Sequence, residues 1–370
     1  MQLQARYWLL PAIMILLGLI SIVTLRSVAA QYATQQLIFL LLGLGLFWFV
    51  SRFSFSFISQ YRWFAYLGLI TLLVLTLLVG SITRNTRRWI SVGGLFSVQG
   101  SQLAAPVIGL AAAHFVAEKS YQKSKNKNLE KDISLKDTLQ LVGLLALPAL
   151  LIVVAPDLGS TIFYLGSISV IILFGPVSWR LLSLLLGGSI VTAVLAWFLV
   201  LQPYQKDRIY CFISPALSST CSTYNAEQSL IAVGSGQLFG RGLGQGVQSH
   251  LQFLPERQTD FIFASFAEEW GLVGSLALIG IFTTLVGYIV NIGFSADKKA
   301  AYYYCMIIAA LIAFQAGFHM GMNMYLFPIK GISLPFVSYG GSSLIGMTLG
   351  LAIVQSIAYN HTSKSERHFR

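Results

Sequence analysis

The sequence has few charged residues, and fewer acidic than basic ones. Asp, Glu, Lys and Arg make up 10% of the 370 residues, and only 13 residues are acidic, whereas a soluble domain carries about 25% charged residues. The alternating segments of about ten residues that are typical of a membrane β-barrel are also missing. Apolar residues make up 56% of the chain, and apolar runs near the roughly 20 residues that span a bilayer recur from end to end. The sequence therefore predicts an all-α polytopic membrane protein.

Ten membrane spans are expected in a single transmembrane domain over residues 1–370. The first span should stay as a helix, because its apolar run is longer than that of a typical cleaved signal peptide. An even number of spans puts both termini on one side. Of the 24 Lys and Arg residues, fifteen then lie on the side of the termini and nine on the other, which favours cytoplasmic termini. The expected spans are 8–25, 36–50, 63–80, 101–117, 139–155, 160–175, 181–200, 261–290, 301–323 and 341–358.

The net charge of +11 does not indicate a nucleic-acid partner. In a soluble protein such a charge would suggest nucleic-acid binding. Here the basic residues lie in the connecting loops, where Lys and Arg set the orientation of the chain in the membrane. We therefore expect no nucleic acid among the partners.

The longest outer connector is the loop 202–260, which precedes the eighth span. Loops of this length are usually functional or disordered. Cys211 and Cys221 both lie in it, and a disulfide between them could persist outside the cytoplasm; two free thiols are the alternative. Cys305 lies within the ninth span and is expected to be a packing residue. No spacing of Cys and His indicates a zinc site.

Two outer segments are rich in glycine and serine. "GSGQLFGRGLGQG", residues 234–246, could present backbone N–H groups to an anion, and Arg241 within it favours that interpretation over a flexible surface loop. No strand is expected before it, which argues against a nucleotide-binding motif. In "SLPFVSYGGSS", Ser342 and Ser343 could cap the tenth span, and the positive end of that helix could bind phosphate.

Three carboxylates lie near the start of the eighth span. Glu268 and Glu269 fall inside it, where a charge costs about 3 kcal/mol, so they should face the bundle interior or a wet cavity. Adjacent residues point about 100° apart and should have separate partners; a structural hydrogen bond is the alternative to a functional role. Asp260 lies at the outer boundary, where partial desolvation would raise its pKa and make it a better base. A helix-capping aspartate is the alternative.

These motifs, taken in order, resemble those of the SEDS family, the shape, elongation, division and sporulation proteins. The motifs that carry the resemblance are "TRRWISVGG", "APDLGS", "YQKDRI", "EQSLIAVGSGQLFGRGLGQGVQSHLQFLPERQTDF" and "ISLPFVSYGGSS". Members of the family are membrane glycosyltransferases. They polymerise lipid II into β1,4-linked glycan strands at the outer face of the bacterial cytoplasmic membrane, together with a class B penicillin-binding transpeptidase.

The resemblance implies a role for several residues. Asp260 matches the family's catalytic aspartate and would be the general base of a single inverting displacement. The leaving pyrophosphate needs positive charge. Arg208 and Arg257 are the first candidates, Arg87 and Arg88 are further ones, and a divalent cation, Mg²⁺ or Mn²⁺, is another. The residues expected to contact substrate are Arg208, Arg257, Glu256, Gln228, Arg241, Lys330 and Ser338.

The chain departs from the family pattern at several positions. Where the family has Q-P-S-E-x-x-K, Gln102 and Ala105 replace the Glu and the Lys. If the two charges form a pair, losing both leaves no unpaired charge. Lys330 stands where the family often has Thr, which adds a cation there. The other replacements are Gln258 for His, Gln237 for Gly and His319 for Asn.

Arg257 and the segment "YQKDR" resemble the elongation branch, the RodA type, more than the division branch, the FtsW type. Two other functions stay open. A lipid II flippase or other transporter would suit the intramembrane carboxylates Glu268 and Glu269. A non-catalytic scaffold that activates a transpeptidase is the other alternative.

Overall fold

Eight helices in the part of the chain that the structure describes are long and apolar enough to cross a membrane, and a ninth apolar helix is shorter. The computed structural model describes residues 2–83, 86–92, 96–125, 134–175, 203–213, 224–251 and 253–368, with isolated residues between 182 and 201. The seventh expected span, 181–200, lies largely outside the described residues. The long helices are α1 (Gln2–Val28), α2 (Ala30–Ser51), α4 (Arg62–Val79), α5 (Ala104–Lys125), α6 (Leu135–Val154), α7 (Leu158–Phe174), α12 (Ile262–Phe294), α13 (Lys299–Asn323) and α14 (Gly341–His368). The prediction of an all-α polytopic membrane protein is confirmed.

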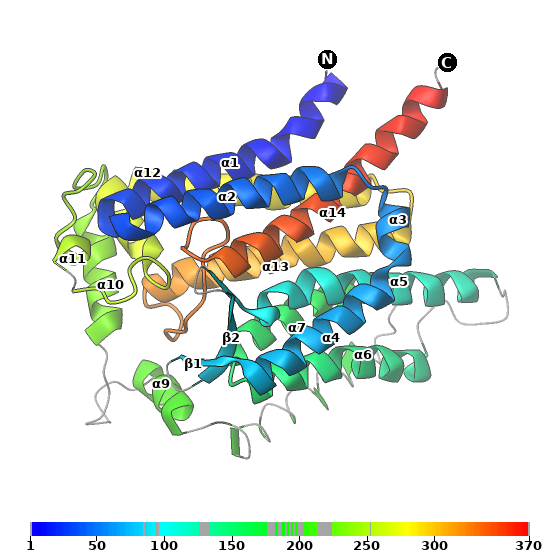
Figure 1. The fold of residues 1–370 in the computed structure, drawn as a ribbon, viewed down its shortest axis with the longest axis horizontal. Helices are drawn as coiled ribbons and strands as arrows, with labels where there is room; N and C mark the ends of the chain where they lie inside the picture. The colour runs from blue at the N-terminus through cyan, green and yellow to red at the C-terminus, as the bar shows by residue number, and fades with distance from the viewer. Residues whose placement is uncertain are drawn as a thin grey trace.

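The two ends of the bundle differ. Both termini project from the same end, where the short helix α3 (Phe55–Gln60) also lies. Helices α10 (Tyr224–Ser235) and α11 (Val247–His250) lie at the opposite end, beside the turn between α1 and α2 (Figure 1). The arrangement agrees with an even number of spans.

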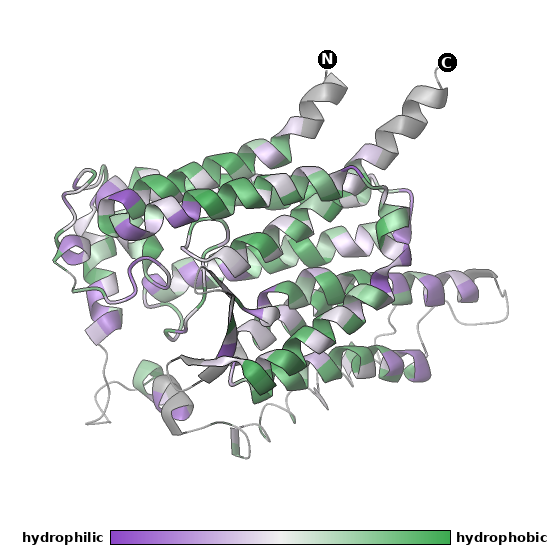
Figure 2. Ribbon diagram, viewed as in Figure 1, coloured by the Kyte–Doolittle hydropathy of each residue, from purple (hydrophilic) through white to green (hydrophobic). Residues whose placement is uncertain are grey.

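The outer surfaces of the long helices are apolar. Figure 2 shows hydrophobic residues along most of α1, α2 and α4, and polar residues concentrated at the two ends of the bundle. Among the large exposed side chains, Trp8, Phe64 and Val79 are more than 70% exposed. Apolar groups at this level of exposure are stable when they face lipid, so this belt is the surface that meets the bilayer.

Helix α13 is the central helix, and it packs against α12, α5 and α7. Small residues let α5 approach it closely: Ala111, Ala112 and Ala113 are fully buried, and a Cβ added to Gly109 would lie 3.1 Å from Ile307. Such small residues are typical of helix contacts in membranes, where close van der Waals packing replaces the hydrophobic effect.

A small antiparallel sheet, which the sequence analysis did not predict, lies between α4 and α5 in the chain. Its strands are β1 (Ser81–Thr83), β2 (Thr86–Val92) and β3 (Phe96–Val98), in the order β1-β2-β3. The sheet is followed by the 3₁₀ turn η1 (Gly100–Leu103), which leads into α5. The expected loop 202–260 also contains helices, namely α9 (Pro203–Ile213), α10 and α11.

Helix α12 is interrupted at Gly271, whose φ of 67° and ψ of −163° are not helical. The carbonyls of Glu268 and Glu269 accept hydrogen bonds from the backbone of Arg241 and Gly242, at 2.9 and 3.1 Å. Past the break, the amides of Leu272 and Val273 donate to the carbonyls of Gln237 and Leu238, at 2.8 and 3.1 Å. Backbone groups freed within a membrane helix need such partners, because no water is present to replace them.

The glycine-rich segment 234–246 is therefore packed into the fold at this break. A Cβ added to Gly240 would lie 2.1 Å from the carbonyl oxygen of Glu269, and one added to Gly271 would lie 2.2 Å from the amide nitrogen of Gly240. Both residues also have positive φ angles. The two backbones approach this closely only because neither residue carries a side chain.

Candidate active site

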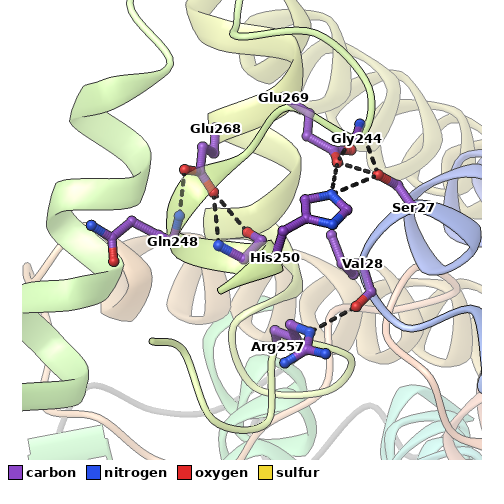
Figure 3. Close-up of polar contacts among 9 residues, drawn as sticks. Ser27, Val28, Gly244, Gln248, His250, Arg257, Glu268 and Glu269 are labelled. Carbon is purple, nitrogen blue, oxygen red and sulfur yellow. Dashed lines mark hydrogen bonds and ion pairs between the residues drawn. The ribbon is translucent and has the colours of Figure 1, made fainter. Parts of the chain in front are cut away.

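Glu268 and Glu269 are buried at the start of α12, as the sequence predicted, and are only 0% and 2% exposed. The carboxylate of Glu268 accepts hydrogen bonds from the amides of Gln248 and Ser249, at 2.9 and 3.1 Å, and from the Ser249 hydroxyl at 2.8 Å. These donors belong to the first turn of α11, so Glu268 fixes that turn against α12 (Figure 3).

Glu269 has a different set of partners, as its orientation on the helix requires. Its Oε1 accepts hydrogen bonds from the Ser27 hydroxyl and from the amide of Gly244, the latter at 3.1 Å. Nε2 of His250 lies 3.5 Å from the same oxygen. Glu269 thereby joins the end of α1, the glycine-rich segment and α11 (Figure 3). The two glutamates hold the outer segments in place, and their contacts are those of structural residues.

The segment before α12 is a tight turn centred on Glu256. The carbonyl of Glu256 accepts hydrogen bonds from the amides of Thr259 and Asp260, both at 3.0 Å, and Glu256 has a positive φ of 57°. Arg257 donates from Nε to the carbonyl of Val28 at 2.7 Å, which ties the turn to the end of α1 (Figure 3). Three of the predicted site residues, Glu256, Arg257 and Asp260, thus lie in one turn.

Asp260 is partly buried and lies two residues before the start of α12. The N-cap position of α12 belongs to Phe261, with no capping bond from its side chain, so Asp260 is not the N-cap residue. A Cβ added to Gly331 would lie 3.2 Å from Oδ2 of Asp260. The carboxylate therefore faces the loop 324–340, and Gly331 leaves the space for it.

Lys330 comes directly before Gly331 in this loop. Its side chain runs close to the start of α7, because a Cβ added to Gly159 would lie 3.3 Å from its Cε. The cation that the sequence predicted at this position therefore lies in the same loop that contacts Asp260.

Ser338 connects this loop to the turn before α12. Its hydroxyl donates to the carbonyl of Thr259 at 2.7 Å and accepts from the amide of Leu334 at 2.7 Å. The amide of Tyr339 donates to the carbonyl of Gln258 at 2.9 Å. Ser338 is 3% exposed, so its position supports the backbone next to Asp260.

Ser342 and Ser343 lie inside the first turn of α14, which begins at Gly341, so they are not its caps. The Ser342 hydroxyl accepts from the amide of Gln99 at 3.0 Å and donates to the carbonyl of Ser97 at 2.9 Å. The Ser343 hydroxyl lies 2.8 Å from that of Ser333. The expectation of plain capping is wrong because both hydroxyls bond other segments.

A small cavity of about 30 Å³ lies between α5, α7, α13 and the loop that carries Gly331. At roughly 10–15 Å³ per water molecule, it has room for about two waters. Oε1 of Gln315 is buried and has no hydrogen-bond partner in the described part of the chain. Gln102 and Ala105 both line the cavity. The two positions where charged residues were expected therefore line the same cavity.

Asp157, in the motif "APDLGS", was not among the predicted site residues. Its carboxylate accepts from Nε2 of Gln99 and from the hydroxyl of Ser101, both at 2.8 Å, and caps α7 through the amide of Ser160. Nη1 of Arg88 lies 3.8 Å away. Asp157 thus joins β2, the segment before α5 and α7, and the motif was the available signal for it.

The remaining predicted residues are farther from this turn or outside the described side chains. Gln228 is half-buried on α10. Arg241 is exposed and donates from Nε to the carbonyl of Ser235 at 3.2 Å. Arg208 lies in α9, but its side chain, like that of Arg87, is outside the described residues.

The cysteine prediction is tested only in part, and the divalent cation stays a prediction. Cys211 is disulfide-bonded, whereas Cys305 is free and buried. Pairing of Cys211 with Cys221 stays a prediction, because Cys221 is outside the described residues. Within the described ranges, no three His, Cys, Asp or Glu side chains gather into a set that could hold a metal ion.

The fold and the site together define a multi-pass α-helical membrane protein with a discontinuous helix at the end where α10 and α11 lie. Within this class, the chain belongs to the family that takes in FtsW, RodA and SpoVE. The sequence profile of that family, described as "Cell cycle protein", matches residues 3–363.

Two relatives are named as glycosyltransferases. The probable peptidoglycan glycosyltransferase FtsW of Coxiella burnetii is 35% identical over 337 residues, which cover 89% of this chain and 87% of the relative. The peptidoglycan glycosyltransferase MrdB of Escherichia coli K12 is 34% identical over 304 residues, which cover 80% and 77%.

Solved structures have the same fold. A chain from a peptidoglycan synthase complex that coordinates polymerization and crosslinking superposes with a TM-score of 0.79 at 24% identity, over 96% of this chain and 98% of that one. The rod shape determining protein RodA of Thermus thermophilus gives a TM-score of 0.70 at 23% identity, over 96% and 97%.

Proposed function

We propose that this protein, a peptidoglycan glycosyltransferase, polymerises lipid II with Asp260 as its general base. In this reaction Asp260 takes the proton from the GlcNAc 4-hydroxyl of the acceptor. The freed oxygen attacks C1 of the donor's MurNAc, and undecaprenyl pyrophosphate leaves. The α linkage of the donor becomes a β1,4 linkage in a single inversion, so no covalent enzyme intermediate is needed.

The observation that carries the proposal is the position of Asp260. Its carboxylate is partly buried at the outer end of a membrane helix, faces Gly331, and lies outside the helix-capping position. Lipid II keeps its tail in the bilayer and its sugar head at the surface. A base for this substrate must therefore stand at the mouth of the bundle, within reach of the sugar.

The leaving pyrophosphate requires positive charge nearby. Arg257 is the cation closest to Asp260 along the chain, three residues before it. Lys330 is the cation of the loop that faces Asp260, next to Gly331. Arg208 is a further candidate. The proposed cofactor is a divalent cation, which would be held by the pyrophosphate itself, because the described residues supply no ligand set for it.

We assign the protein to the elongation branch and expect a class B penicillin-binding transpeptidase as its partner. The named relatives are equally similar, at 35% for FtsW and 34% for MrdB, so the assignment depends on Arg257 and "YQKDR". The similarity to a chain of a synthase complex supports the partner. Depletion in the source bacterium should give rounded cells; filaments would place the protein in division.

The direct test is polymerisation by the purified protein. Incubation with lipid II should give glycan polymer, resolved by gel electrophoresis, and an Asp260→Asn preparation made in parallel controls for contaminating polymerases. If labelled lipid II crosses proteoliposome membranes and no polymer forms, the protein is a flippase. A third outcome is that the protein alone neither forms polymer nor moves lipid II. If polymer then forms only with an added transpeptidase and the Asp260→Asn protein supports it equally well, the protein is a scaffold.

A further inference from the structure

The first amides of α12 have no acceptor within the helix, as at any helix N-terminus. The amide of Ala264, the third residue of α12, is one of them, and it would donate to the carbonyl of Asp260 only if the helix began one residue earlier. Here that amide donates instead to Oδ1 of Asn323, at 3.2 Å. Nδ2 of Asn323 in turn donates to the carbonyl of Asp260, at 3.1 Å. The Asn323 amide is thus inserted between the two backbone groups.

The orientation of this amide is fixed by its other contacts. Nδ2 of Asn323 also donates to the carbonyl of His319 at 2.8 Å, so both of its hydrogens have acceptors. Turning the amide over would point its oxygen at two carbonyl oxygens and its nitrogen at an N–H group. The Ser229 hydroxyl, from α10, lies 3.4 Å from Oδ1 of Asn323 and donates to the backbone carbonyl of Asn323 at 2.8 Å. Asn323 itself is fully buried.

The insertion has a geometric consequence for Asp260. Because the Asn323 amide occupies both the Ala264 N–H and the Asp260 carbonyl, the helix does not extend to Asp260. The helix begins at Ile262, and Phe261 takes the N-cap position without a side-chain bond. Asn323 supplies the cap from another helix, because its oxygen accepts from the third residue of α12 as an N-cap side chain does.

We infer that Asn323 is a positioning residue for Asp260. It holds the carbonyl of Asp260 outside the helix, so that the carboxylate points toward Gly331 and the loop 324–340. Asn323 is also the last residue of α13, at the point where that loop begins. One amide therefore fixes the relation between the base and the loop that carries Lys330. This inference rests on the proposed function, in which Asp260 is the base.

Two substitutions separate positioning from capping. Asn323→Leu keeps the volume and lets the Ala264 amide bond the Asp260 carbonyl directly, so the helix should extend to Asp260 and turn its carboxylate away. Asn323→Asp keeps an acceptor for the Ala264 amide but sets a carboxylate oxygen against the Asp260 carbonyl. Asn291→Leu, at the exposed far end of α12, is the matched control.

The measurements are kcat and KM for lipid II and the thermal midpoint of each purified variant. Misplacing a reacting group by a fraction of an ångström should lower kcat about tenfold in both Asn323 variants, with KM within about twofold. The thermal midpoint of Asn323→Asp should fall, because its buried carboxylate faces the carbonyl oxygens of Asp260 and His319, so kcat is compared per folded molecule. Asn291→Leu should match the wild type throughout.

A wild-type kcat in Asn323→Asp would show that capping alone is needed and would overturn the inference, as would a wild-type kcat in Asn323→Leu. If Asn323→Leu does not fold, Asn323→Asp decides alone. Asp260→Asn is assayed in the same series. If it is as active as the wild type, the proposed base is wrong; if it is inactive while the Asn323 variants are fully active, only the positioning role is wrong.

Discussion

Two acidic sites lie within ten residues of each other, and they differ in burial and in their hydrogen-bond partners. Glu268 and Glu269 are almost fully buried, and the donors to them come from α1, α11 and the glycine-rich segment. Asp260 is partly exposed, and its backbone is held by Glu256 and Asn323. Burying a charge is costly without hydrogen-bond partners, and the donors to the two glutamates come from segments that they tie to α12, which suits a structural role. A partly exposed carboxylate at the end of the helix can exchange a proton with a substrate.

The largest effect is expected at Asp260. Asp260→Asn keeps the size of the side chain and removes its basicity, so polymerisation of lipid II should fall about 10³-fold, the middle of the range for a general base. The thermal midpoint should stay at the wild-type value, because Asn keeps the size and much of the hydrogen bonding of Asp. Glycan product is measured at matched protein concentration. Equal rates for the wild type and Asp260→Asn would show that Asp260 is not the base, and the two acidic sites would no longer differ in function.

The second prediction tests whether a buried charge needs its partner. Ala105→Lys would place a lone cation in the cavity beside neutral Gln102, at a cost of about 3 kcal/mol in the free energy of unfolding. Adding Gln102→Glu should recover much of that cost, since both positions line the same cavity. Chemical unfolding in detergent compares the two. If single and double variants unfold alike, the side chains do not meet.

The third prediction concerns the structural pair. Glu268→Ala leaves the amides of Gln248 and Ser249 without their acceptor, which should lower the free energy of unfolding by about 2 kcal/mol. Activity per folded molecule should change little. Glu268→Gln, which keeps one acceptor oxygen, should lose less. A stable but inactive Glu268→Ala protein would mean that the two acidic sites act together.

The smallest effect is expected at Arg257. Arg257→Ala removes one cation near the leaving group and should raise KM for lipid II about tenfold, the scale of one hydrogen bond to a charged group. Because Nε of Arg257 also bonds the carbonyl of Val28, Arg257→Lys, which keeps the charge, is the control. If both variants are less stable than the wild type while KM for lipid II is unchanged, the role of Arg257 is structural.

Sequence reasoning located the membrane helices and the boundary position of Asp260, because the length of apolar runs reports directly on insertion into lipid. It also predicted that Glu268 and Glu269 face inward with separate partners. It could not predict those partners, since Ser27 and Glu269 are separated by 242 residues. It missed the break at Gly271, because a single glycine within an otherwise helical pattern is tolerated and does not by itself indicate a break. Asn323 gave no signal, since its role depends on the position of the start of another helix.

The break at Gly271 also determines a length. The 33-residue α12 would measure about 50 Å if it were straight, at 1.5 Å per residue, whereas the hydrocarbon core of a bilayer is about 30 Å thick. The part beyond the break, Leu272–Phe294, is about 35 Å long, enough by itself to cross. The part before it, Ile262–Trp270, adds at most about 14 Å between the lipid and Asp260. The position of the break therefore limits the distance between the Asp260 carboxylate and the hydrocarbon core. That distance determines which part of the head group of a lipid-anchored substrate the carboxylate can reach.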